Sequence, residues 1–172
     1  MHAFAALIRA VPDFPRPGVL FRDITPLLAD ADGFAECIAA LAAPWRDAGV
    51  QAVCGIEARG FIVGAALAQA LGAGFMPLRK PGKLPPPVLA VDYRLEYGND
   101  RLEARSDALQ PGQRVLLVDD VLATGGTLAA AQALVGRFGA ELAGAAVVIE
   151  LEALGGRARW SGAQPLRALL RY

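Results

Sequence analysis

The sequence predicts an α/β fold: a single domain built on a central, mostly parallel sheet with helices on both faces. Short apolar segments alternate with helical segments along the 172 residues, as they do where helices connect parallel strands. Residues 115–118 are apolar at every position, which is typical of a strand buried on both faces. Hydrophobic residues make up 55% of the chain, enough at this length to bury a real core.

The first half of the chain contains two predicted helices and two predicted strands. A helix is expected over residues 33–48, because apolar residues recur there with helical spacing; Asp30 or Asp32 caps it and Gly49 ends it. The other expected elements are a strand over residues 52–56, a helix over 61–71 closed by Gly72, and a strand over 75–78.

The second half begins with a segment of a different kind. Residues 79–107 are rich in proline and charge, and they alternate weakly around 89–97 and 102–105, as a β-hairpin does. After a turn signal at Pro111-Gly112 the remaining expected elements are the strand over 115–118, a loop over 124–127, a helix over 128–138 ended by Gly139, and strands over 142–149 and 166–170.

Composition excludes several classes of function. Lys plus Arg and Asp plus Glu number 17 each, so no general positive charge favours nucleic acid or an anionic membrane. The single histidine, His2, excludes a Ser-His-Asp triad and most zinc sites. Cys37 and Cys54 lie among apolar residues and predict reduced, buried thiols. With no signal-peptide pattern, and an apolar segment at 60–78 too rich in glycine for a membrane span, we expect a cytoplasmic protein.

The strongest functional signal is residues 115–127, VLLVDDVLATGGT. Asp119 and Asp120 end the buried strand, and a loop of small residues opens the next helix. Backbone N–H groups at the start of a helix can bind a phosphate, and glycines let the phosphate come close to the backbone. The two carboxylates can accept hydrogen bonds from sugar hydroxyls. The pattern matches neither GxxxxGK[ST] nor GxGxxG, and a plain capped turn leaves the paired aspartates unexplained. We therefore expect a ribose 5-phosphate site whose phosphate contacts Ala123, Thr124, Gly125, Gly126 and Thr127.

This segment resembles the 5-phosphoribosyl 1-pyrophosphate motif of the type I phosphoribosyltransferases. Further segments resemble the members of that family that act on adenine, in the same order and spacing, and they are residues 15–25 (PRPGVLFRDIT), 57–61 (EARGF), 79–84 (RKPGKL) and 95–98 (LEYG). The resemblance covers nearly the whole chain. It implies the family's fold, with an N-terminal base-binding hood over residues 1–30 and a flexible lid hairpin over 80–106.

The resemblance also implies a function. It predicts a purine salvage enzyme that transfers the phosphoribosyl group of 5-phosphoribosyl 1-pyrophosphate to adenine, giving AMP and pyrophosphate, with Mg²⁺ as cofactor. The metal would bridge substrate oxygens, and we assign it no direct protein ligand. A homodimer is expected, because the basic side chains of residues 79–84 need anionic partners; no nucleic acid or membrane partner is expected.

Two segments are candidates for binding pyrophosphate. Residues 57–59 follow a strand and open a helix, which makes a second anion-binding turn, although alone they also fit an exposed capping pair. The basic loop at 79–83 leaves a strand at the ligand edge of the sheet, although a charge cluster is usually a solvated face. The resemblance assigns both to pyrophosphate, predicts a cis bond between residues 57 and 58, and names Glu57, Ala58, Arg59, Arg79, Lys80 and Lys83.

The resemblance places the base on Phe21, whose ring would stack on adenine, with backbone groups of Leu20 and Arg22 at the edge of the purine. Without the resemblance, the segment around Phe21 is predicted to be too irregular for a sheet strand. Glu96 in the lid would bond to purine N7–H or handle the proton of the attacking nitrogen, and both roles stay open. Together with Asp119 and Asp120 it forms the expected catalytic set.

Composition also predicts how the lid behaves. Three consecutive prolines, few large apolar side chains and many charges leave residues 85–105 little surface to bury, so this segment should open without global unfolding and exclude water when closed.

Two rival functions are compatible with parts of the sequence. A transferase for xanthine or guanine is disfavoured by the segments around Phe21 and Glu96, which match the adenine-specific members. A regulatory protein that binds nucleic acid through a retained phosphoribosyl pyrophosphate pocket needs a basic face, and the balanced net charge argues against it.

Overall fold

The computed structural model describes residues 2–95 and 98–172. The chain forms two compact units, Met1–Ala40 and Leu41–Tyr172. The first unit contains a short hairpin and short helices, and the second contains the main sheet.

In the N-terminal unit, β1 (Arg9–Val11) pairs antiparallel with β2 (Phe21–Asp23) after the short 3₁₀ helix η1 (Ala3–Leu7). The prediction that the Phe21 segment is too irregular for a sheet strand is therefore wrong. The prolines lie in the connecting loop, where Asp13 accepts a hydrogen bond from the Gly18 N–H at 2.8 Å, and they leave β2 free to pair. The strand belongs to a two-stranded sheet separate from the main one.

Two helices follow, α1 (Thr25–Ala29) and α2 (Ala31–Ala42). Of the two candidate caps for α2, Asp30 is the one that caps the helix, since its Oδ1 accepts a hydrogen bond from the Gly33 N–H at 2.7 Å. The helix ends at residue 42, before the predicted residue 48, and the 3₁₀ helix η2 (Ala43–Trp45) replaces its last turns. Pro44 explains the early end, because proline lacks the N–H that the next α-helical hydrogen bond needs.

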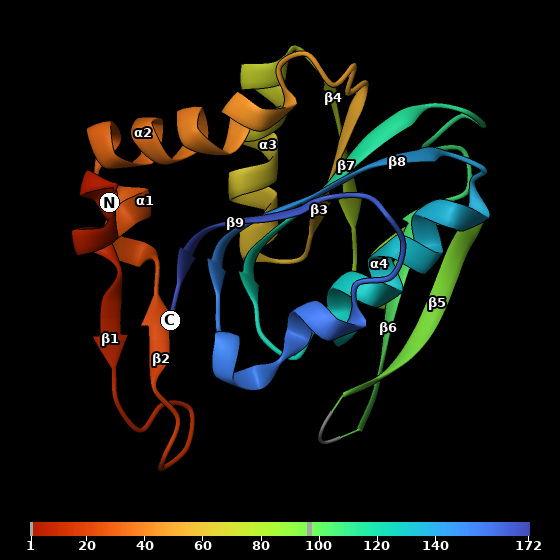
Figure 1. Ribbon diagram of the computed structural model, residues 1–172. Coiled ribbons are helices and arrows are strands. Elements are labelled where there is room, and N and C mark those ends of the chain that lie inside the picture. Colours follow the sequence, from red (N-terminus) through yellow and green to blue (C-terminus); the bar gives the residue numbers. More distant parts are fainter. Residues whose placement is uncertain (1, 96–97) are drawn as a thin grey trace. The chain divides into compact units, whose positions relative to one another are not determined.

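The second unit is built on a five-stranded sheet of order β4-β3-β7-β8-β9, in which every neighbouring pair is parallel (Figure 1). The predicted parallel sheet is confirmed, and each predicted strand is present, with β7 and β8 longer than expected. The strands are β3 (Ala52–Ile56), β4 (Gly74–Leu78), β7 (Arg114–Leu122), β8 (Glu141–Glu150) and β9 (Leu166–Arg171).

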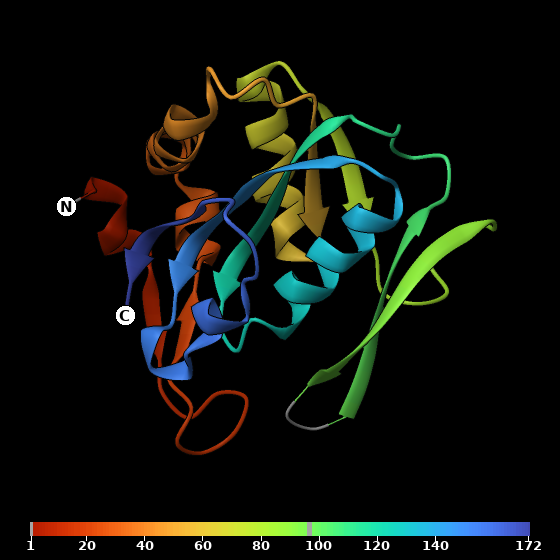
Figure 2. The same ribbon diagram turned by 45° about the vertical axis from the view of Figure 1, so that its right-hand side comes forward.

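Helices α3 (Arg59–Leu71) and α4 (Gly126–Arg137) lie on opposite faces of this sheet (Figure 2). The α3 face carries Gly55, where an added Cβ would lie 2.8 Å from the backbone oxygen of Gly60 in α3, so the helix approaches closely only because glycine stands there. On the α4 face, buried side chains of the helix share one core with Cys54 and Leu117. Alternation along β3 sends residues 54 and 55 to different faces.

Strands β5 (Val88–Leu95) and β6 (Gly98–Arg105) form the expected antiparallel hairpin. Leu102 and Ala104 are fully buried, and Leu89, Val91 and Tyr93 pack against the same core. The prediction that this segment has little to bury is wrong for these residues. Its weak alternation places the apolar side chains on one face, and that face covers the main core.

After β8 the chain forms two short 3₁₀ helices that the sequence did not predict, η3 (Glu152–Leu154) and η4 (Gly156–Arg159), before it returns as β9. Cys37 and Cys54 are both buried and free, and burial raises the pKa of each thiol to about 12. None of the helices in the described residues has the length and apolar character required to cross a membrane.

Candidate active site

The carboxyl ends of β3, β4 and β7 meet at one edge of the sheet, because these neighbouring strands are parallel. Ligands bind at this edge in open parallel sheets. Three of the segments singled out in the sequence leave it: residues 57–59 after β3, residues 79–83 after β4, and residues 119–127 at the end of β7.

The candidate phosphate loop is residues 123–127. Gly125 has φ +79°, a backbone conformation that other residues rarely adopt, and α4 begins directly after it at Gly126. Gly126 and Thr127 therefore belong to the first turn of the helix, two residues earlier than predicted, so their N–H groups lie at the positive end of its dipole. A pocket of about 70 Å³ lies here, lined in part by Ala123, Thr124, Gly125, Thr127 and Asp119.

The two adjacent aspartates have different surroundings. Asp119 lines the phosphate-loop pocket, and its Oδ1 accepts the Asp120 N–H at 2.9 Å. The Asp120 side chain is 6% exposed and pairs with Arg59, whose Nε donates to Oδ2 at 2.5 Å. Loss of water around the carboxyl, and then the charge of Asp120, raise the pKa of Asp119 well above its ordinary value.

Gly60 explains how α3 comes so close to this pair. A Cβ at residue 60 would lie 2.8 Å from Oδ1 of Asp119 and 3.1 Å from the carbonyl oxygen of Val118. Only glycine lets the first turn of α3, with Arg59, reach the end of β7.

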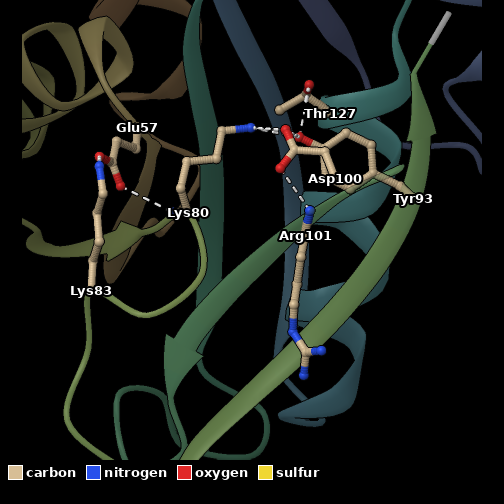
Figure 3. A network of polar contacts seen from close by, with 7 residues as sticks. All are labelled: Glu57, Lys80, Lys83, Tyr93, Asp100, Arg101 and Thr127. Carbon is tan, nitrogen blue, oxygen red and sulfur yellow. Dashed lines mark hydrogen bonds and ion pairs between the residues drawn. The ribbon is translucent and has the colours of Figure 1, made fainter. Parts of the chain in front are cut away.

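Glu57 is the centre of the second group of charges (Figure 3). The bond between Glu57 and Ala58 is cis, as predicted. Oε2 of Glu57 accepts the Lys80 N–H at 2.9 Å and Nε of Arg79 at 3.4 Å, while Oε1 pairs with Lys83. Burial alone raises the pKa of Glu57, but the hydrogen bonds from these three residues outweigh it and hold the pKa below its ordinary value.

Lys80 extends this group toward the hairpin and α4 (Figure 3). Its ammonium pairs with Asp100 and donates to the Tyr93 hydroxyl at 2.8 Å; Tyr93 in turn donates to Asp100 at 2.9 Å. The Thr127 hydroxyl lies 3.4 Å from the Tyr93 hydroxyl. The hairpin thereby connects the predicted pyrophosphate and phosphate segments.

Each of the four candidate cations is paired with a carboxylate: Arg59 with Asp120, Arg79 and Lys83 with Glu57, and Lys80 with Asp100. The same chain therefore supplies anionic partners to the basic loop, and the charge of this loop alone does not require a second copy. Residues 79 and 103 also exchange two backbone hydrogen bonds of 2.8 Å, which fix the loop to β6.

Sequence reasoning missed Tyr93 and Asp100. The available signal was weak: Tyr93 continues the alternation of Leu89 and Val91, and Asp100 is its register partner in the hairpin. Leu20, Phe21 and Arg22 belong to the N-terminal unit, where the Phe21 ring makes an edge contact with Phe14 at 5.2 Å between centroids. Glu96 lies outside the described residues.

The chain is similar in sequence to phosphoribosyltransferases. The family model for the phosphoribosyl transferase domain matches residues 28–162. The chain is 57% identical over 165 residues to the adenine phosphoribosyltransferase of Xanthomonas campestris pv. campestris strain B100, covering 96% of this chain and 89% of that protein.

Solved structures agree with this. Adenine phosphoribosyltransferase from Rhodothermus marinus superposes with a TM-score of 0.93 at 48% identity, over 98% of this chain and 96% of that one. The Saccharomyces cerevisiae enzyme, solved with an imino-altritol bisphosphate and adenine, gives a TM-score of 0.92 at 37% identity, over 97% and 96% of the two chains.

Proposed function

The chain belongs to the phosphoribosyltransferase family, and from this premise we propose that it transfers a phosphoribosyl group to adenine in purine salvage. In the reaction a nitrogen of adenine bonds to C1 of 5-phosphoribosyl 1-pyrophosphate, and the bond from C1 to the pyrophosphate oxygen breaks. Pyrophosphate leaves with the bonding electrons, and the adenine nitrogen loses its proton to give AMP.

The observation that carries this proposal is the arrangement around the end of β7. The phosphate loop and Asp119 share one pocket, while Asp120 pairs with Arg59 at the start of α3. A ribose 5-phosphate seated there places its phosphate on residues 123–127 and its hydroxyls near the carboxylates, with the leaving group toward the cations. Donors fixed before the reaction stabilise charge that develops on pyrophosphate.

Substrate binding exchanges partners at this site. For Arg59 to contact pyrophosphate it must give up part of its bond to Asp120, which frees that carboxylate for a ribose hydroxyl. Arg79, Lys80 and Lys83 likewise exchange Glu57 and Asp100 for phosphate oxygens. The exchange keeps each cation next to an anion in both states, and Glu57 retains the Lys80 N–H as a donor when its cations turn to phosphate.

Mg²⁺ fits this donor set as a substrate-bound ion. The described residues contain no group of three or more potential metal ligands, and Asp119 and Asp120 offer only neighbouring carboxylates. Mg²⁺ commonly uses one or two carboxylates together with waters and substrate phosphates. When bound, the metal neutralises charge on the leaving group.

We assign adenine recognition to Phe21, with backbone groups of Leu20 and Arg22 at the edge of the purine. The yeast relative solved with adenine supports the choice of base. Glu96 is the candidate for the purine N7–H or for the proton of the attacking nitrogen. Any closing motion of the lid leaves residues such as Leu102 in place, since they are buried in the core.

We also propose a homodimer in the cytoplasm, where Cys37 and Cys54 stay reduced. Ile62 on α3 and Phe75 on β4 are 47% and 37% exposed and provide apolar surface for a subunit contact. Sedimentation that finds only an 18.0 kDa species at working concentration would refute the dimer.

The direct test is a base screen. The protein is incubated with 5-phosphoribosyl 1-pyrophosphate, Mg²⁺ and each of adenine, guanine, hypoxanthine and xanthine, and the nucleotides are separated by chromatography. We expect AMP as the main product, and none without Mg²⁺. A different nucleotide would show another base specificity, and no nucleotide at all would refute the enzymatic function.

A further inference from the structure

The phosphate loop rests directly on the backbone of a distant segment. A Cβ at Gly125 would lie 2.2 Å from the carbonyl oxygen of Gly156, and a Cβ at Gly156 would lie 2.1 Å from the carbonyl oxygen of Ala123. Neither position has room for a side chain. Gly156, at the start of η4, therefore forms the support against which the loop is packed.

Arg157, the next residue, fixes this support to the sheet. Its Nε and one terminal nitrogen donate to the two carboxylate oxygens of Glu150 at 2.8 and 2.5 Å, and its other terminal nitrogen donates to the Leu166 carbonyl at 2.8 Å. Glu150 is the last residue of β8, and Leu166 is the first of β9. The planar guanidinium thus joins two strands to the backbone beside Gly156.

The Glu150 carboxylate depends on this contact. Its side chain is 6% exposed, and a second cation, Arg171, is 57% exposed and 3.5 Å away. The hydrogen bonds from Arg157 hold the pKa of Glu150 below its ordinary value. A second connection ties the same segment to α4, where the Gln132 amide donates to the Ser161 carbonyl at 2.5 Å.

We propose that Arg157 is a positioning residue for the transfer reaction: paired with Glu150, it sets the phosphate loop through Gly156. The inference rests on the proposed function, since it assumes that residues 123–127 hold the 5′-phosphate. Binding and catalysis at a phosphate need the donors placed to within a fraction of an ångström. A shift of Gly156 moves the carbonyl of Ala123 and the backbone of Gly125, and with them the N–H groups that face the phosphate.

The test compares Arg157→Lys with Arg159→Lys. Lysine keeps the charge at residue 157 but cannot make the fork to Glu150 together with the Leu166 contact. Arg159 lies in the same short helix with an exposed side chain and serves as the matched control. We expect Arg157→Lys to raise the KM for 5-phosphoribosyl 1-pyrophosphate about tenfold. The affinity for ribose 5-phosphate, measured by calorimetry, should fall by the same factor, with the KM for adenine unchanged.

Gly156→Ala tests the same contact without touching the ion pair. Its methyl group collides with the Ala123 carbonyl, so we expect the same pattern of constants. Gly136→Ala is the control, since an added Cβ there meets no atom within 4 Å. A merely structural role would lower the thermal midpoint and the active fraction and leave both KM values unchanged.

The outcomes separate this inference from the proposed function. Folded Arg157→Lys and Gly156→Ala proteins with wild-type constants would overturn the positioning role, and so would a loss of fold in both. If the wild-type protein binds ribose 5-phosphate but makes no nucleotide, the proposed reaction fails, while weaker ribose 5-phosphate binding by Arg157→Lys still supports the positioning role.

Discussion

The two proposed anion-binding regions of this site are built in opposite ways. The phosphate loop, residues 123–127, offers backbone N–H groups and small side chains, and it is fixed by direct backbone packing on Gly156. The pyrophosphate region, which we define as residues 57–59 and 79–83, offers long cationic side chains, each held by a carboxylate.

This difference matches what happens to the two anions in the proposed reaction. The 5′-phosphate stays bound through the chemical step, so donors that are fixed in advance suit it. Pyrophosphate must be bound, stabilised as charge develops, and then released. Side-chain cations with carboxylate partners waiting nearby permit that release, because they return to Glu57, Asp100 and Asp120 when the anion leaves.

The strongest challenge to the fixed region is Gly125→Ala. The added Cβ would lie 2.2 Å from the Gly156 carbonyl oxygen, and the backbone there has φ +79°. We expect loss of ribose 5-phosphate binding and a fall in kcat/KM of about 100-fold or more. Gly136→Ala in α4 should behave as wild type, and near-normal ribose 5-phosphate affinity in Gly125→Ala would show that the loop is not rigid.

The double substitution Asp119→Asn, Asp120→Asn tests the junction of the two regions. It removes the proposed anionic acceptors for the ribose hydroxyls and the partner of Arg59. A hydrogen bond to a charged group is worth about 1.5–3 kcal/mol, so kcat/KM should fall by roughly 10–100-fold. Thermal unfolding should change little, because asparagine keeps the size of both side chains and the Arg59 side chain, 48% exposed, stays solvated. Full activity would remove both residues from the ribose site.

Lys83→Met probes the exchangeable region alone. We expect pyrophosphate affinity at low salt to fall about tenfold through loss of one charge-assisted contact, and its dependence on salt to weaken. Ribose 5-phosphate affinity should stay unchanged, since we propose that residues 123–127 bind it. Arg46→Met removes a charge from an exposed position and is the control. An equal loss of affinity for pyrophosphate and for ribose 5-phosphate would show that the two regions do not bind separate anions.

The smallest effect concerns pH. The pKa of Glu57 lies below its ordinary value of 4.5 in the folded protein, so its contribution to stability is complete above that pH. It is lost as the pH falls through the folded pKa. Glu57→Gln should lower the free energy of unfolding at pH 7 by about 1 kcal/mol, as measured by urea unfolding. In this variant the free energy of unfolding should also decrease less as the pH falls. Asp47→Asn at an exposed position should leave the curve unchanged; a parallel shift at all pH values in Glu57→Gln would contradict the assignment.

Some features of the molecule follow from the sequence because they are local. The residues at 115–118 and 123–127 are contiguous in the chain, so strand, loop and helix are specified by neighbouring residues. The structure confirms the strand and the presence of the loop and the helix, and it begins the helix two residues earlier than predicted. The same holds for the turn after β3, whose cis bond was predicted from a contiguous motif. The main errors, at β2, at the end of α2 and in the hairpin, arose where pairing or packing with another segment decided the outcome.

The sequence by itself determined which residues carry charge, where glycine permits tight backbone and in what order strands and helices occur, because these depend on residues close along the chain. Tertiary structure alone decided the partners. Arg59 meets Asp120 across 61 residues, and Gly156 lies behind Gly125, because strand order and register bring these segments together. A contact between distant residues has no local signature, since either residue is equally compatible with many other neighbours until the sheet is assembled.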